Sequence, residues 1–200
     1  MKTLKTILAG AMIAIGATAM AQSVVMEENF SSFKEQGWRA GSDTLACGKK
    51  KVDSKSNFKV TKVYGSEKIT FGFKHAAVTP ECGAKKTPSA VSNGYVEINK
   101  KEGSELTVGP FKEVTTVEVG ASATGDVRGY ALYKSIDGGA FTKVGEYIGA
   151  KSEGQDAQYG FNSVATINSK NVTLKFVPTI CGKDEPAMQT FRIHNIKVNK

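Results

Sequence analysis

The side chains that could carry chemistry in this sequence are few and widely spaced. There are two histidines, His75 and His194, among 200 residues. An enzyme needs an acid, a base or a nucleophile that converge on one place. The sequence lacks the Gly-x-Ser-x-Gly, His-Glu-x-x-His and Glu-x-Asp-x-x-Glu spacings that mark common hydrolase sites. We therefore expect no catalytic residues, and a small polysaccharide lyase or hydrolase is the weakest alternative.

A second kind of chemistry, the binding of sugars, needs aromatic ring faces and a few polar groups. Trp38 is the single tryptophan, and it follows a glycine in a polar stretch. Tyr64 ends a strand-like run, and Lys49, Lys50 and Lys51 form a short basic run. These five residues are the predicted ligand-binding set. The alternative is that Trp38 is a packed aromatic anchor and that Lys49, Lys50 and Lys51 belong to a solvated loop.

The first 21 residues have the pattern of a secretory signal peptide. Lys2 and Lys5 precede an apolar run that ends at Ala19-Met20-Ala21, a small-residue cleavage box. The run is too short for a stable membrane span, and no second one follows. We expect residues 1–21 to be removed and residues 22–200 to form one exported domain.

The net charge is +8 at pH 7, and removal of Lys2 and Lys5 leaves about +6. A modest positive charge favours acidic partners, such as uronic-acid polysaccharides or an anionic cell surface. A lysine-coated, solvated sheet is the plainer explanation. We expect no nucleic-acid partner, because the sequence has an export signal and no nucleic-acid motif.

Cys47, Cys82 and Cys181 are each followed by glycine in turn-like surroundings. In an oxidising compartment two of them are expected to pair, but the sequence does not say which two. A metal site of three cysteines with His75 is disfavoured, because no Cys-x-x-Cys spacing is present.

The elements that must position these residues are strands. The clearest is a hairpin, in which 127–136 and 141–148 flank Asp137-Gly138-Gly139, residues that tolerate positive φ. Further strands are predicted at Val24–Phe30, Phe58–Tyr64, Ile69–Lys74, Gly94–Asn99, Glu105–Val108, Val114–Ala121, Tyr159–Val164, Asn171–Pro178 and Gln189–Val198. Long loops are predicted at 31–57, 75–91 and 179–186. The spacing and the lack of helix signals predict an all-β sandwich or barrel.

The order of these segments resembles a known family. VVMEENFSSF near the start, then GSELTVGPF, VTTVEVGAS, YALYKSIDGGAFTKVGE and NVTLKFVPT, and TFRIHNIKV at the end resemble secreted jelly-roll sandwiches of Gram-negative bacteria. These include galactose-binding-like domains and carbohydrate-binding modules. The resemblance implies an all-β, two-sheet jelly-roll β-sandwich as a single domain, with its first and last strands adjacent and antiparallel.

The resemblance also implies where other features lie. It places Cys47 and Cys181 in one neighbourhood, with Cys82 able to join them, and favours a disulfide that includes Cys181. Such modules often hold a structural calcium between the first and last strands, which would use Glu27, Glu28 and Asn195. The last strand has His194-Asn195 where an aspartate is usual, and calcium prefers several anionic oxygens.

Together these features favour an exported, non-catalytic module that binds a polysaccharide or oligosaccharide. It would lie in the periplasm, on the outer surface or outside a Gram-negative cell. The main alternative is a cell-envelope interaction or assembly domain that contacts another protein through a sheet edge or face.

Overall fold

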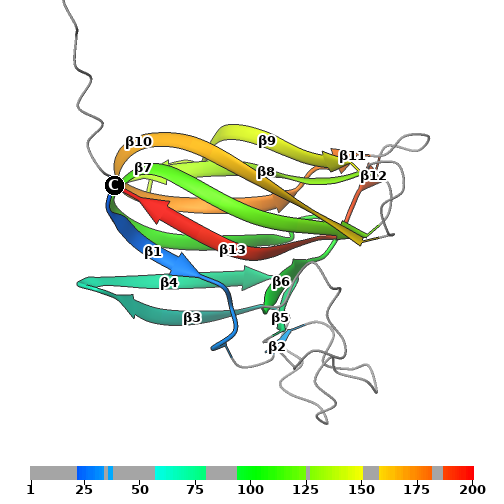
Figure 1. The fold of residues 1–200 in the computed structure, drawn as a ribbon, viewed down its shortest axis with the longest axis horizontal. Helices are drawn as coiled ribbons and strands as arrows, with labels where there is room; N and C mark the ends of the chain where they lie inside the picture. Colours follow the sequence, from blue (N-terminus) through cyan, green and yellow to red (C-terminus); the bar gives the residue numbers. More distant parts are fainter. Residues whose placement is uncertain are drawn as a thin grey trace, which may run out of the picture.

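The computed structural model describes residues 22–33, 36–37, 57–79, 94–124, 127–150, 158–181 and 187–200. The regular elements in these ranges are all β-strands (Figure 1). They are β1 (Val24–Glu28), β2 (Gln36–Gly37), β3 (Asn57–Tyr64), β4 (Glu67–Lys74), β5 (Ala76–Thr79), β6 (Tyr95–Ile98), β7 (Glu105–Thr124), β8 (Val127–Ile136), β9 (Thr142–Ala150), β10 (Gln158–Pro178), β11 (Ile180–Cys181), β12 (Ala187–Met188) and β13 (Phe191–Asn199). The predicted all-β class is confirmed.

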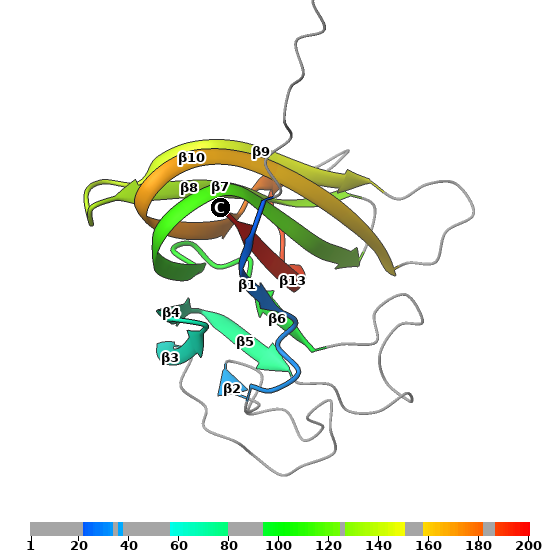
Figure 2. The same cartoon turned by 60° about the vertical axis from the view of Figure 1, so that its left-hand side comes forward.

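Two long strands, β7 and β10, build both layers of the sandwich. They pair with each other along most of their length. The first residues of β7 also pair with β4, and its last residues pair with β13. The end of β10 pairs with β8. Figure 2 shows both long strands curving round at one end of the molecule.

The two layers are therefore parts of one hydrogen-bonded sheet of eleven strands. One layer holds β3, β4, β8 and β9 beside one half of the β7–β10 pair, and the other holds β1, β2, β5, β6 and β13 beside the other half. Strands that bend from one layer into the next are a known way to make the corners of a sandwich. The sequence predicted separate strands at 105–108 and 114–121, because Gly109-Pro110 and Lys112-Glu113 interrupt the apolar pattern. In the structure β7 runs through these residues as one strand.

The fold-over point has particular backbone requirements. Asn168 and Asn171 adopt positive φ, a conformation that asparagine tolerates better than most residues. Gly109 also has positive φ, and a Cβ atom there would lie 2.8 Å from the carbonyl oxygen of Val172. The Lys134 ammonium donates to the Ile167 carbonyl (3.0 Å) and to Ser169 Oγ (2.9 Å), which satisfies acceptors at the bend.

The core lies between the layers. Val172, Leu174 and Phe176 alternate along β10, a pattern that predicts one buried face, and all three are fully buried. Tyr130 and Leu132 of β8 are buried beside them. On the facing layer, the residues of β13 that are buried include Phe191, Ile193, Ile196 and Val198. Alternate side chains of a strand point to opposite faces, yet the buried positions of β13 change from odd-numbered to even-numbered residues between Ile193 and Ile196. Such a change requires an irregularity in the strand, and the register shift between Ile193 and Asn195 is that irregularity.

The first and last strands lie side by side. β1 pairs antiparallel with β13, with Glu28 opposite Ile196 and Val24 opposite Asn199. This confirms the arrangement that the family resemblance implied. The predicted loop 75–91 begins instead with strand β5, which extends the sheet through β6. Residues 1–21 lie outside the described residues. In the ranges that the structure does describe, no helix is long and apolar enough to span a membrane.

The two open sides of the sandwich are closed by contacts between layers. On one side the Tyr130 hydroxyl bonds to Ser163 Oγ of β10. The ring of Phe161 lies against the backbone of Gly149 in β9, so a side chain at Gly149 would collide with it. On the opposite side β1 faces β3, and the contacts there form the site described next.

Candidate functional site

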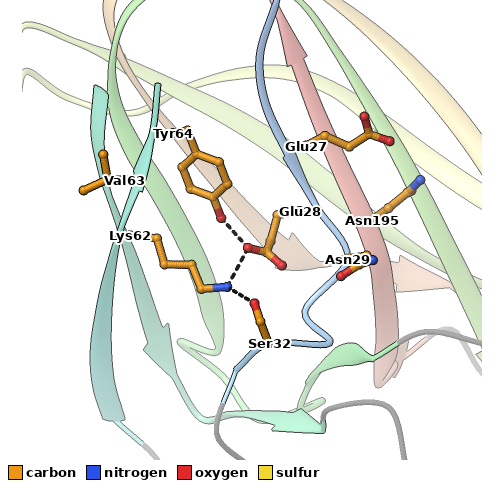
Figure 3. A pocket seen from close by; sticks show the side chains of 8 residues that line it. All are labelled: Glu27, Glu28, Asn29, Ser32, Lys62, Val63, Tyr64 and Asn195. Carbon is orange, nitrogen blue, oxygen red and sulfur yellow. Dashed lines mark hydrogen bonds and ion pairs between the residues drawn. The ribbon is translucent and has the colours of Figure 1, made fainter. Parts of the chain in front are cut away.

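A polar hollow of about 570 Å³ lies where the end of β1 faces the end of β3. Small-molecule sites commonly have volumes of 300–1,000 Å³. The lining residues come from β1, the turn after it, β3 and β13: Glu27, Glu28, Asn29, Ser32, Lys62, Val63, Tyr64 and Asn195 (Figure 3). Four residues that the sequence singled out, Glu27, Glu28, Tyr64 and Asn195, are thus brought together.

Glu28 is the centre of the hydrogen-bonded group that lines one side of the hollow. It is only 4% exposed. Its Oε1 accepts from the Phe30 backbone N–H at 2.6 Å, and its Oε2 accepts from the Lys62 ammonium at 2.9 Å and from the Tyr64 hydroxyl. A buried carboxylate is tolerated only when it is paired and hydrogen-bonded, and Glu28 is both.

Lys62 and Tyr64 come from alternate positions of the edge strand β3 and point toward Glu28 (Figure 3). The Lys62 ammonium also bonds to Ser32 Oγ and lies 3.9 Å from the Phe33 ring centroid. Burial raises the pKa of the Tyr64 hydroxyl, and the bond to Glu28 raises it further. Tyr64 therefore stays protonated at neutral pH and acts as a hydrogen-bond donor.

The other side of the hollow offers groups for a ligand. Glu27 is exposed and has no hydrogen-bond partner among the described residues. Asn29 lies at the turn, where its Oδ1 accepts from the Ser31 backbone and hydroxyl. Asn195 Oδ1 accepts from the Gly120 N–H, and its Nδ2 group has no partner among the described residues. A carboxylate and two amides suit a ligand rich in hydroxyl groups.

These residues do not fit a calcium ion. Glu27 and Glu28 are consecutive in a strand, so their carboxylates point to opposite faces. Both oxygens of Glu28 already accept hydrogen bonds, and Lys62 neutralises its charge. The Asn195 carbonyl is bound to a backbone amide. Within the ranges that the structure describes, no group of three or more His, Cys, Asp or Glu side chains could hold a metal.

The other predicted residues lie elsewhere. Trp38 and Lys49–Lys51 fall outside the described residues, so their role stays a prediction. Cys47 and Cys82 also fall outside them, and Cys181 lies in β11 opposite Ala187. The disulfide therefore also stays a prediction.

Sequence reasoning did not single out Lys62, Ser32 or Asn29. The signal for Lys62 was present, because the alternation in β3 puts Lys62 on the same face as Phe58 and Val60. A charge on the inward face of a strand requires a partner. What the sequence could not show was that the partner lies 34 residues earlier, in the other layer.

The two histidines do not join this site. His194 lies at the irregularity in β13, where its Nε2 bonds to Ser122 Oγ and its ring lies 5.7 Å from that of Tyr95. Burial, helped by the nearby Arg192 cation, lowers the pKa of His194 to about 4. His194 is therefore neutral at pH 7, in keeping with the role of a packed sheet residue.

Comparison with known proteins gives distant similarities. No family model matches the chain, and no curated protein matches it. Among solved structures, the K2 cleaved adhesin domain of Lys-gingipain has a TM-score of 0.46 at 13% identity, with coverage of 71% of this chain and 98% of that one.

Carbohydrate-binding modules also match. CpGH89CBM32-6 from Clostridium perfringens has a TM-score of 0.34 at 17% identity, with coverage of 62% and 93% of the two chains. The module of Cellvibrio mixtus lichenase 5A, solved with cellotriose, has a TM-score of 0.31 at 9% identity, with coverage of 89% and 98%.

Proposed function

We propose that this protein is an exported, non-catalytic module that binds glycan chains, and that the hollow between β1 and β3 is its binding site. The observation that carries the proposal is that Glu27, Asn29 and Asn195 line one hollow of about 570 Å³. Carboxylate and amide groups form the directional hydrogen bonds that select among sugar hydroxyls. The predicted export signal would bring the protein to the compartment in which such polymers occur.

The Glu28–Lys62–Tyr64 network acts as the rigid base of this site. Its donors and acceptors already bond to one another, so it changes little when a ligand binds. A preformed base lowers the entropy cost of binding. Trp38 and Lys49–Lys51 are expected to add a ring face and positive charge for an acidic glycan.

A glycan array probed with the mature protein tests this function. We expect binding to at least one glycan class, with about tenfold weaker binding when Glu27→Gln is combined with Asn29→Ala. Trp38→Ala run in parallel tests the predicted aromatic contact. Glu113→Gln, an exposed glutamate at the fold-over point, is the matched control and should bind normally.

Two results would contradict the proposal. One is an array without signal across neutral and acidic glycans. The other is a Glu27→Gln/Asn29→Ala variant that binds as well as the unmodified protein, with circular dichroism showing an intact fold.

The alternative is an envelope protein that pairs with a partner through a sheet edge. β3 is such an edge, since among the described strands it pairs with β4 alone. Lys62 disfavours pairing there, because an inward-pointing charge in an edge strand protects that edge from strand addition. Val63, which is 70% exposed on the outer face, is an isolated apolar residue there.

A further inference from the structure

A second surface of the molecule has its own chemistry. On the outer face of the layer that holds β3, β4 and β8, paired positions run across five strands. Lys59 lies opposite Gly72, Gly72 opposite Thr107, Thr107 opposite Lys175, and Lys175 opposite Tyr133. Paired side chains of antiparallel strands share a face, so these five positions form one row, here named the outer row. At the usual strand separation it spans about 19 Å.

One end of the outer row is hollowed. A groove of about 330 Å³ lies over β3, β4 and the start of β7, and its lining includes Lys59, Gly72, Lys74, Glu105 and Thr107. Gly72 contributes no side chain, and a Cβ atom there would collide with Thr107 Oγ1. Because Gly72 has no side chain, the groove stays open between Lys59 and Lys74.

The other end of the outer row is aromatic. The Lys175 ammonium lies 5.1 Å from the Tyr133 ring centroid and 4.3 Å from that of Phe141, whose side chain is 36% exposed. The same ammonium is 4.0 Å from the Glu105 carboxylate, a long contact for an ion pair. Lys175 therefore links the groove to a pair of partly exposed rings.

The charges on the two outer faces differ. On the layer with β6 and β13, Arg192 pairs with Glu97 at 2.8 Å and Lys197 pairs with Glu118 at 3.4 Å. On the outer row and its groove, Glu105 lies opposite Lys74 in the β4–β7 register and 4.0 Å from the Lys175 ammonium, and Lys59 and Lys74 form no ion pair with any described residue. Three lysines therefore share one carboxylate, and this excess of positive charge attracts anionic ligands to that face.

We propose that the outer row is a binding surface for an extended acidic polysaccharide, a chain of uronic acid residues. Its carboxylates would meet Lys59, Lys74 and Lys175, and its rings would lie against Tyr133 and Phe141. A linear chain suits a row of about 19 Å better than a single sugar does. The proposal shares its ligand class with the proposed function but places the ligand on a different surface from the hollow.

The test is isothermal titration of the mature protein with polygalacturonate oligomers at 50 mM and 500 mM NaCl, beside a neutral β-glucan oligomer. We expect Lys59→Gln, Lys74→Gln and Lys175→Met together to weaken polygalacturonate binding at least tenfold. The methionine keeps the aliphatic contact with the rings. A control with Lys100→Gln, Lys112→Gln and Lys170→Gln loses the same charge at other exposed positions and should bind within about twofold.

High salt should weaken binding of the unmodified protein and have a smaller effect on the triple variant of the outer row, because salt screens the lysine contacts. Equal losses in the two triple variants would overturn the proposal, since net charge alone would then explain binding. Absence of polygalacturonate binding by the unmodified protein would also overturn it.

The Glu27→Gln/Asn29→Ala variant separates this inference from the proposed function. If only that variant loses glycan binding, the hollow is the site and the outer row is not. If only the outer-row variant loses binding, the outer row is the site and the hollow is not.

Discussion

The contact between Glu28 of β1 and Lys62 and Tyr64 of β3 should be a main support of the open side of the sandwich. Replacement of Glu28 by alanine removes three acceptor contacts at once. The Phe30 amide would lose its acceptor, and the Tyr64 hydroxyl would lose its charged partner. Lys62 would keep Ser32 as a partner, and its side chain is 22% exposed, so water can solvate part of the charge.

These contacts set the expected size of the effect. Removal of one partner of a buried ion pair costs about 3–5 kcal/mol, and an unsatisfied buried amide costs about 1–3 kcal/mol. Because Lys62 retains access to water, we take the lower end and expect Glu28→Ala to lower the free energy of unfolding by about 3 kcal/mol. Glu28→Gln keeps one oxygen for the Phe30 amide and should cost about 1.5 kcal/mol.

Urea unfolding followed by circular dichroism measures both values, and the melting temperature of Glu28→Ala should fall by roughly 6–12 °C. The matched control is Glu27→Ala, because Glu27 is the neighbouring glutamate and points outward. It should change stability by less than about 0.5 kcal/mol. A loss below about 1 kcal/mol for Glu28→Ala, or an equal loss for Glu27→Ala, would refute the assignment of Glu28 as the buried centre of the contact.

Three further outcomes follow from other parts of the fold. The pKa of His194 is about 4 in the folded protein and near 6.5 when unfolded, so the unfolded state takes up the proton first and stability should fall, by up to about 3 kcal/mol, as pH drops from 6.5 to 4. His194→Gln should flatten that pH dependence in thermal melts, and an unchanged pH dependence in this variant would contradict the assignment. Gly109→Ala should cost at least about 2 kcal/mol by urea unfolding, since its Cβ atom would meet the Val172 carbonyl at positive φ. Lys134→Met should cost about 1–2 kcal/mol and speed amide exchange at the β10 bend, and normal exchange there would contradict its role.

Much of the strand layout could be predicted because strand periodicity is local. The central hairpin is present as predicted, with Asp137 and Gly138 at positive φ and the Gly139 N–H bonded to the Ile136 carbonyl. The alternation through Val172, Leu174 and Phe176 identified buried residues correctly. Ile136 differs: it alternates with Tyr130 and Leu132 in β8 but is 44% exposed, because it is the last residue of that strand and lies at the hairpin turn.

The candidate site shows where such reasoning ends. Sequence and family resemblance pointed to Glu27, Glu28, Tyr64 and Asn195, and these residues do share one hollow. The expected use of Glu27 and Glu28 together as cation ligands does not fit, since neighbouring strand residues face opposite ways.

The sequence by itself determined the β class, the hairpin turn and the inward face of the strand that holds Val172, Leu174 and Phe176, because each of these depends on side chains a few positions apart. Only the tertiary structure decided that β7 and β10 bend together and fold one sheet over into two layers. That fold-over brings Lys62 to Glu28 across the open side, so one carboxylate becomes a buried support while its neighbour Glu27 stays exposed. Contacts between residues far apart in the chain depend on the path of the whole backbone, which no local pattern specifies.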